Sequence, residues 1–193
     1  MSSPDLAQLP ETFSYAQALR AGLTHHRLYK LRDAGQLEQV GRGLYRKADA
    51  GLTDFDLLEA AQRAPQATIC LLSALARHEL TDAIPSHYDL ALPRDRWHPR
   101  IGGSVRWHSF DRATFHIGRT RIPVDEVTEI GLYDAPRTIV DAYRLRNTIG
   151  PDVANEALRR WLREGGRPAQ LLAVARAFPR AMPAIRTTLE ILL

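Results

Sequence analysis

Cysteine is almost absent from this chain of 193 residues, in which Cys70 is the only one. A single thiol cannot form a disulfide within the chain or supply the ligands of a cysteine-rich zinc site. Long apolar segments are also missing, because the most apolar stretch, residues 67–76, ends at Arg77, well short of the ~18 residues of a membrane span. The N-terminus lacks the basic and then apolar pattern of a signal peptide. We therefore expect a cytoplasmic protein with no membrane partner.

The sequence also lacks the familiar catalytic motifs. No nucleophile elbow, Walker loop or dinucleotide-binding glycine pattern follows a predicted strand. Four histidines lie on different predicted strands and loops without helical ligand spacing: His87, His98, His108 and His116. We therefore predict neither a metal site nor a cofactor, and we expect a protein that is not an enzyme.

One enzymatic alternative stays open at this point. The middle of the chain contains carboxylates of the kind that hold Mg²⁺ in nucleases: Asp89, Asp125, Glu126 and Glu129. No basic residue stands among them in a recognisable motif. A magnesium-dependent nuclease or nucleotidyl-transferring enzyme is therefore the weaker reading, and we expect a solvated or partner-facing acidic surface.

Positive charge is concentrated near the N-terminus. The chain is 45% hydrophobic and 25% charged with a formal net charge of only +4, as is typical of one or two globular domains. Residues 20–47, however, contain seven basic side chains against Asp33 and Glu38. This local excess indicates an anionic partner, although a solvated basic face is the commoner meaning of such a run.

Two short helices are predicted within this basic region. Ser14 followed by Gln17 forms a capping-box pattern before a helix over residues 15–21, and Gly22 stands where a left-handed cap ends a helix. Thr24 can cap a second helix over residues 25–34. The short connection with its glycine is typical of a helix-turn-helix.

A hairpin is predicted to follow the two helices. Residues 37–40 and 44–46 alternate in polarity on either side of a Gly-Arg-Gly turn at 41–43. A helix-turn-helix followed by a basic hairpin indicates a winged helix. We therefore expect residues 1–52 to form a winged helix-turn-helix DNA-binding domain.

The rest of the chain predicts a second, mixed domain over residues 53–193. Helical patterns at 55–64 and 68–80 precede a region of period-two patterning at about 86–131, with strands expected at 87–92, 104–108, 114–117 and 121–124. Four further helices are expected from Pro136 to the C-terminus, several of them beginning at proline. The predicted fold class is α+β, with a small, mainly antiparallel sheet and C-terminal helices.

The second helix is the predicted DNA reader. Its Leu28 and Leu31 share an inner stripe, which leaves the other side free to meet bases in a major groove. Base and phosphate contacts are predicted from the helix and its cap: Thr24, His25, His26, Arg27, Tyr29, Lys30 and Arg32. The hairpin adds predicted backbone or minor-groove contacts from Arg42, Arg46 and Lys47. Tyr45 is interpreted as a packed hairpin aromatic.

Two groups of short segments carry a family resemblance: residues 13–19 with 22–24, 28–31, 35–37 and 43–46 near the N-terminus, and residues 72–78, 88–93 and 135–141 further along. The first group resembles the N-terminal winged helix, and the second the C-terminal region, of AbiEi-type antitoxins of bacterial type IV toxin-antitoxin systems. The last segment, 135–141, contains Arg137-Thr138 followed by Asp141, in which we interpret Arg137 and Asp141 as an i,i+4 pair that anchors a helix to the sheet.

The resemblance implies a bacterial antitoxin that also represses its own operon. Such a protein binds double-stranded promoter DNA with inverted repeats, associates with itself on the DNA, and counteracts a nucleotidyltransferase-like toxin encoded beside it. By matching positions, residues 24–32 would read DNA and residues 41–47 would form the wing. An alternative is a winged-helix transcriptional regulator whose C-terminal domain senses a ligand or dimerises.

Overall fold

The computed structural model describes residues 6–50, 54–102 and 104–193, which divide into two compact units. The first unit contains the described residues up to 65 together with 99–102 and 123–130, and the second contains 66–98, 104–122 and 131–193. The α+β fold class is confirmed, with a three-stranded sheet near the N-terminus and a five-stranded sheet followed by helices. The domain boundary predicted at residue 52 lies outside the described residues.

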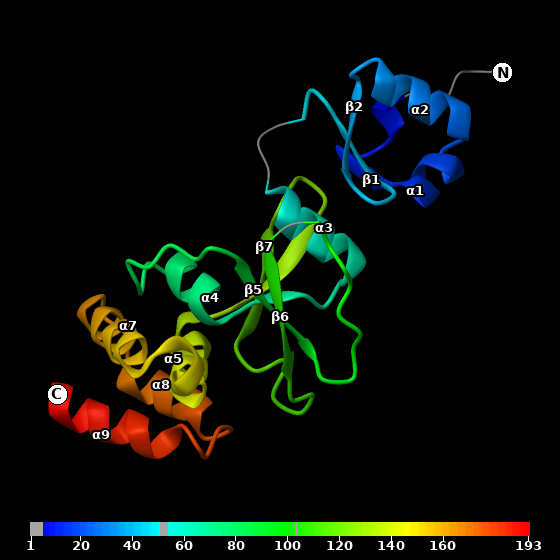
Figure 1. The fold of residues 1–193 in the computed structure, drawn as a ribbon. Helices are drawn as coiled ribbons and strands as arrows, with labels where there is room; N and C mark the ends of the chain where they lie inside the picture. Colours follow the sequence, from blue (N-terminus) through cyan, green and yellow to red (C-terminus); the bar gives the residue numbers. More distant parts are fainter. Residues whose placement is uncertain (1–5, 51–53, 103) are drawn as a thin grey trace. The chain divides into compact units, whose positions relative to one another are not determined.

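Up to residue 65, the described part of the first unit forms three helices, one 3-10 turn and three strands (Figure 1). In chain order they are η1 (Leu6–Gln8), β1 (Thr12–Ser14), α1 (Tyr15–Arg20), α2 (His25–Asp33), β2 (Leu37–Gly41), β3 (Leu44–Lys47) and α3 (Phe55–Arg63). The strand order is β1-β3-β2, with both pairings antiparallel. The two helices and the hairpin follow the predicted pattern, whereas β1 was not predicted.

The caps predicted from sequence are present at α1 and α2. Ser14 Oγ accepts a hydrogen bond from the Gln17 amide at 3.2 Å, and Gln17 Oε1 accepts one from the Ser14 amide at 2.7 Å. Thr24 Oγ1 accepts a hydrogen bond from the Arg27 amide at 3.2 Å. Gly22 has a φ of 88° after α1, a left-handed conformation that glycine adopts at little cost. Local side-chain chemistry therefore sets the ends of both helices.

One apolar cluster holds α1, α2 and the hairpin together. It contains Leu9, Phe13, Ala18, Leu23, Leu28, Leu31, Leu37 and Tyr45. Leu28 is 1% exposed, which fixes one face of α2 against the unit and turns the opposite face outward. Tyr45 is buried and stacks on Phe13 with ring centroids 6.3 Å apart, so its interpretation as a packed aromatic is confirmed.

The second sheet is mixed rather than mainly antiparallel. Its strands are β4 (Thr68–Ile69), β5 (Tyr88–Pro93), β6 (Val105–Phe110), β7 (Arg119–Pro123) and β8 (Glu129–Tyr133), in the order β6-β5-β4-β8-β7. β4 runs antiparallel to β5, but β4 with β8 and β5 with β6 are parallel pairs. The predicted sheet was wrong in two places. β4 lies within the apolar stretch that was assigned to a helix at 68–80, and residues 114–117, predicted as a strand, form turns.

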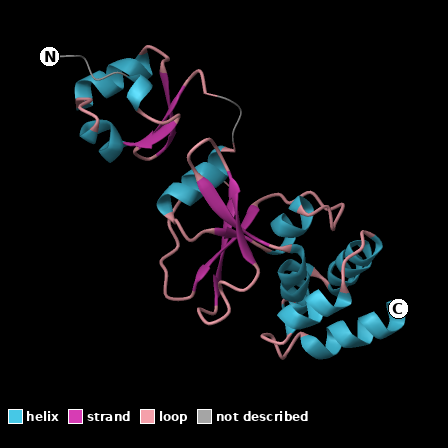
Figure 2. Cartoon of the chain, turned by 180° about the vertical axis from the view of Figure 1, so that it is seen from behind, coloured by secondary structure: helices cyan, strands magenta, loops and turns pink. Residues whose placement is uncertain are grey.

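The helices of the second unit gather beside this sheet (Figure 2). They are α4 (Leu71–Arg77), α5 (Ala135–Arg144), α6 (Arg146–Ile149), α7 (Pro151–Arg163), α8 (Pro168–Ala175) and α9 (Met182–Leu192). Pro151 and Pro168 begin α7 and α8, positions where the missing amide hydrogen costs nothing. Ile185 and Leu189 of α9 are buried in the same core as residues of α5 and α7, so one face of α9 packs within the chain, while Ile191 and Leu193 are exposed.

Arg137 joins α5 to the rest of the second unit. Its side chain is fully buried, and its Nε donates a hydrogen bond to Asp141 Oδ2 at 2.9 Å. Its Nη1 donates to the carbonyl oxygens of Thr114 and Ile117, both at 2.6 Å, and its guanidinium lies 4.1 Å from the centroid of the Tyr133 ring. The predicted i,i+4 pair is confirmed, and it anchors the helix to the turns before β7.

Cys70 is expected to be unreactive in the native protein. The thiol is fully buried at the start of α4, and this burial raises the pKa of Cys70 well above its ordinary value. Since the thiolate is the reacting species, Ellman's reagent should modify the native chain far more slowly than the same chain in urea. Equal rates in the two solutions would contradict the burial of Cys70.

Candidate nucleic-acid interface

The N-terminal half of α2 presents an exposed polar surface. Thr24, His25, His26, Arg27 and Lys30 are all exposed, while Tyr29 is half-buried. The first turn of α2 contains no acidic side chain, so nothing there offsets the positive end of the helix dipole. Free amides at such a helix start, together with the Thr24 hydroxyl, can hold a phosphate oxygen.

The turn of the β2–β3 hairpin presents Arg42. This arginine is exposed between Gly41 and Gly43, and Gly43 has a φ of 73°, which a residue with a side chain adopts only with strain. Lys47, at the end of β3, is half-buried. The hairpin therefore offers one exposed cation at its tip and a second, partly covered one at its base.

Tyr15 connects the hairpin turn to the start of α2. Its amide donates a hydrogen bond to the Gly43 carbonyl at 2.8 Å. Its ring meets the His25 ring edge-on, with centroids 5.9 Å apart. The two segments predicted to contact DNA are therefore brought to the same end of the first unit, although His25 and Gly43 are 18 positions apart in the chain.

Arg46 and Arg32 lie differently from the other predicted contacts. Arg46 is only 4% exposed, lies 3.6 Å from Glu11 Oε2, and has its guanidinium 5.7 Å from the Phe55 ring. A buried guanidinium with these neighbours is not open to a phosphate, so we give Arg46 a packing role. Arg32 hydrogen-bonds to Asp33 Oδ1 through Nε and Nη2, and this bond raises the pKa of Arg32.

Two residues of α3 contact the turn of the β2–β3 hairpin, a feature that the sequence did not indicate. Arg63 donates hydrogen bonds to the carbonyls of Arg42, at 3.3 Å, and Arg100, at 2.8 Å, and pairs with Glu59 at 2.8 Å. A Cβ on Gly41 would lie 2.8 Å from Glu59 Cδ. These contacts border a hollow of about 490 Å³ in the first unit, and they restrain the turn that carries Arg42.

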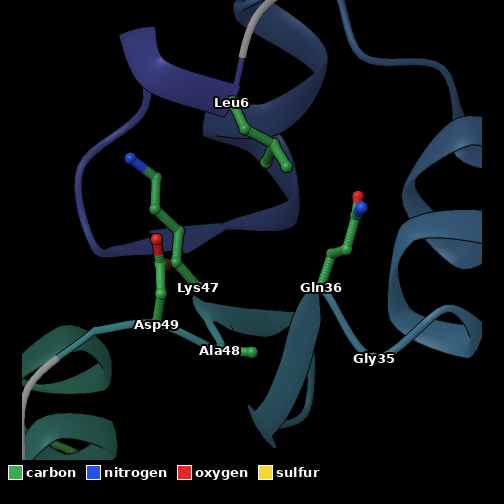
Figure 3. A pocket seen from close by; sticks show the side chains of 6 residues that line it. All are labelled: Leu6, Gly35, Gln36, Lys47, Ala48 and Asp49. Carbon is green, nitrogen blue, oxygen red and sulfur yellow. The ribbon is translucent and has the colours of Figure 1, made fainter.

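A second hollow of about 540 Å³ lies near the C-terminal end of α2 (Figure 3). It is lined by Leu6, Gly35, Gln36, Lys47, Ala48 and Asp49. In Figure 3 the Leu6 side chain enters from η1 between Lys47 and Gln36. The lining brings one amine, one carboxylate and one amide together, without a nucleophile beside a base.

Several of the histidines and carboxylates weighed for metal binding have hydrogen-bond partners within the chain, and His87 and His108 both lie against Asp89, at 3.4 and 2.8 Å from its Oδ1. His98 Nε2 lies 3.1 Å from Ser109 Oγ, and Asp125 Oδ1 accepts the Thr128 amide at 2.6 Å. Among the described residues, no group of three or more histidine, cysteine or acidic side chains is placed to hold a metal ion. Nor does the described part contain a helix with the length and hydropathy of a membrane span.

Comparison with known proteins gives a partial match. The crystal structure of the RV2827C protein from Mycobacterium tuberculosis is similar with a TM-score of 0.54 and 17% identity, over 95% of this chain and 77% of that one. At this identity the likeness shows the fold alone. No curated protein matches the chain. Residues 4–46, which contain α1, α2 and most of the hairpin, match the model of a family described as transcriptional regulator, AbiEi antitoxin.

Proposed function

We propose that this chain is an antitoxin that binds its own promoter through an N-terminal winged helix-turn-helix and thereby represses its own transcription. The observation that carries the proposal is the placement of the exposed start of α2 and the Arg42 turn at one end of the first unit, joined through Tyr15. The family match over residues 4–46 supports it. In this proposal the chain acts in the cytoplasm of a bacterium by occupying DNA, without catalysis.

Each part of the surface has a proposed role. The outer side of α2, with His25, His26, Arg27, Tyr29 and Lys30, would read base edges in the major groove. Thr24 and the α2 amides would hold a phosphate, and Arg42 and Lys47 would contact the neighbouring backbone. About four phosphate contacts would give a salt slope of about −3.6. One such unit binds weakly, so we propose that two copies associate on inverted repeats.

A titration with DNA tests the proposal directly. The purified chain is titrated by fluorescence anisotropy against its own upstream promoter duplex and an unrelated duplex of equal length, each at two salt concentrations. We expect tight, promoter-selective binding that weakens as salt rises, because phosphate neutralisation supplies much of the affinity. Equal, weak binding to both duplexes would contradict the regulator role.

Removing two cations of the proposed DNA surface, one on α2 and one at the hairpin turn, should change the salt dependence in a defined way. We expect the double variant Lys30→Ala, Arg42→Ala to bind the promoter more weakly and to flatten the salt slope by about one to two units. The control is Arg176→Ala, Arg180→Ala, which removes the same charge from two exposed sites of the second unit. An unchanged slope in the first variant would exclude this surface from DNA binding.

The antitoxin half of the proposal concerns a nucleotidyltransferase-like toxin encoded beside this chain. Co-expression of the chain should restore the growth of cells that express the neighbouring gene. A neighbouring gene that is harmless when expressed alone would favour a regulator without a toxin. This growth assay does not depend on the DNA titration, so the two halves of the proposal can fail separately.

A further inference from the structure

A loop from further along the chain folds against the hairpin turn of the first unit. Residues 99–102 belong to the first unit, although the strands before and after them, β5 and β6, belong to the second. We call residues 99–102 the Arg100 loop. Three of its residues line the hollow of about 490 Å³, together with Arg42 of the turn and Arg63 of α3. The surface around the hairpin turn is therefore built partly from residues outside the predicted winged helix-turn-helix.

One ion pair on α3 connects the Arg100 loop to the hairpin turn. The Arg63 guanidinium donates through Nη1 to the Arg100 carbonyl at 2.8 Å and through Nη2 to the Arg42 carbonyl at 3.3 Å. The Glu59 carboxylate pairs with Arg63 at 2.8 Å and accepts the Gly102 amide through Oε2 at 3.0 Å. Glu59 is only 4% exposed, so the loss of these partners would leave a buried charge uncompensated. The backbones of Arg42 and Arg100 are therefore held next to each other.

The side chains of Arg42 and Arg100 carry positive charge that nothing nearby offsets. Both side chains are exposed. Of the residues that the structure describes, no carboxylate forms an ion pair with either guanidinium, and Glu59 pairs with Arg63 instead. The sequence around the Arg100 loop adds no counter-charge, because residues 96–110 contain no aspartate or glutamate. Two arginines on neighbouring backbone segments without a counter-charge create a positive potential that attracts an anionic partner.

We infer that Arg100 is a further phosphate contact of the DNA surface, placed beside the Arg42 turn by the Glu59–Arg63 pair. The inference rests on the proposed function and extends its DNA surface beyond residues 24–47. A guanidinium binds phosphate through parallel N–H donors, and such contacts position a protein on a duplex without reading its sequence. Arg100 therefore adds affinity for any duplex, while Glu59 and Arg63 are positioning residues that do not touch the DNA.

Replacement of Arg100 tests the inference in the full chain. The binding of Arg100→Ala to the promoter duplex and to the unrelated duplex is measured by fluorescence anisotropy over a series of salt concentrations. One phosphate contact contributes about 0.9 to the salt slope, so we expect the slope to flatten by about one unit and both duplexes to bind about eight-fold more weakly at about 0.1 M salt. Arg100→Lys keeps the charge and should keep the slope. Arg180→Ala, at an exposed site of the second unit, is the matched control.

The positioning role of Arg63 has a separate readout. Arg63→Lys leaves a cation beside the buried Glu59 carboxylate but removes the planar set of donors that holds two carbonyls at once. We expect its salt slope to flatten as well, because Arg100 is no longer fixed beside the Arg42 turn. Adding Arg100→Ala to Arg63→Lys should then cause little further loss of slope, since both changes act on one contact. Fully additive losses would show that Arg63 does not act through Arg100.

The outcomes separate this inference from the proposed function. If the wild-type chain binds both duplexes equally weakly, the proposed function and the inference fall together. If the wild type binds its promoter selectively and Arg100→Ala keeps the full salt slope, only the inference falls. If Arg100→Ala and Arg100→Lys both lose binding together with a lowered melting temperature, Arg100 supports the fold rather than a phosphate contact, and the inference falls as well.

Discussion

Arg137→Ala is expected to lower the free energy of unfolding of the second unit by about 3–5 kcal/mol. The substitution leaves the fully buried Asp141 carboxylate with Arg144 as its only paired cation among the described residues, at 2.9 Å. It also removes the donor to the carbonyls of Thr114 and Ile117. A buried charge that loses one partner is more costly than a pair that is replaced as a whole. Urea unfolding followed by tryptophan fluorescence measures the loss.

The loss of stability caused by Arg137→Ala should depend on pH, and the protonation of Asp141 determines whether it grows or shrinks as pH rises. Burial raises the pKa of Asp141 above its ordinary value even though Arg137 and Arg144 act to lower it. Without Arg137 the folded-state pKa rises further, so the folded variant holds a proton that the unfolded chain has released. The stability gained from that proton is present at acidic pH and is lost as pH rises through the folded-state pKa. We therefore expect the deficit of Arg137→Ala to be smaller at pH 5 than at pH 7.

An exposed arginine provides the control for Arg137→Ala. Arg159 on α7 lies 3.8 Å from Glu156, and its side chain is 49% exposed. Exposed pairs of this kind contribute about 0–1 kcal/mol, so Arg159→Ala should change stability little. Similar losses in Arg137→Ala and Arg159→Ala would contradict the anchoring role of Arg137.

The features that the sequence predicted well are those set by neighbouring residues. The Ser14 capping box and the Thr24 cap each depend on side chains within three positions of the helix start. The Arg137–Asp141 pair likewise follows from helical spacing. The strand β4 was not predictable, because a two-residue strand is defined by its partners: Thr68 lies opposite Ala91 on one side and Gly131 on the other.

In the candidate site, too, features set by local periodicity were predicted, and features set by contacts with other elements were not. The outward position of His26, Arg27 and Lys30 follows from the periodicity of α2 around Leu28. The burial of Arg46 does not follow from a local pattern, because it depends on Glu11, 35 positions earlier, and on Phe55, which belongs to a different element, α3. Outside the candidate site, the 75% exposure of Trp97 was equally unpredictable, since a single aromatic residue gives no periodic signal that distinguishes a core position from an exposed one.

Leu28→Ala is expected to unfold the first unit preferentially, with a loss of about 2–5 kcal/mol in its free energy of unfolding. Leu28 is 1% exposed and packs with Leu23, Phe13 and the other members of the N-terminal cluster. Its truncation leaves a cavity at the point where α2 is fixed, so promoter binding should be lost as the first unit melts. Leu19→Ala is the matched control, because Leu19 on α1 is 44% exposed.

The distribution of tryptophan makes the selectivity of Leu28→Ala measurable. The three tryptophans of the chain, Trp97, Trp107 and Trp161, all belong to the second unit. Tryptophan fluorescence therefore reports the second unit, whereas far-ultraviolet circular dichroism reports the helices of both. For Leu28→Ala we expect an early loss of part of the dichroism signal with an unchanged fluorescence midpoint. A fluorescence midpoint that shifts together with the dichroism would instead show that the two units unfold as one cooperative body.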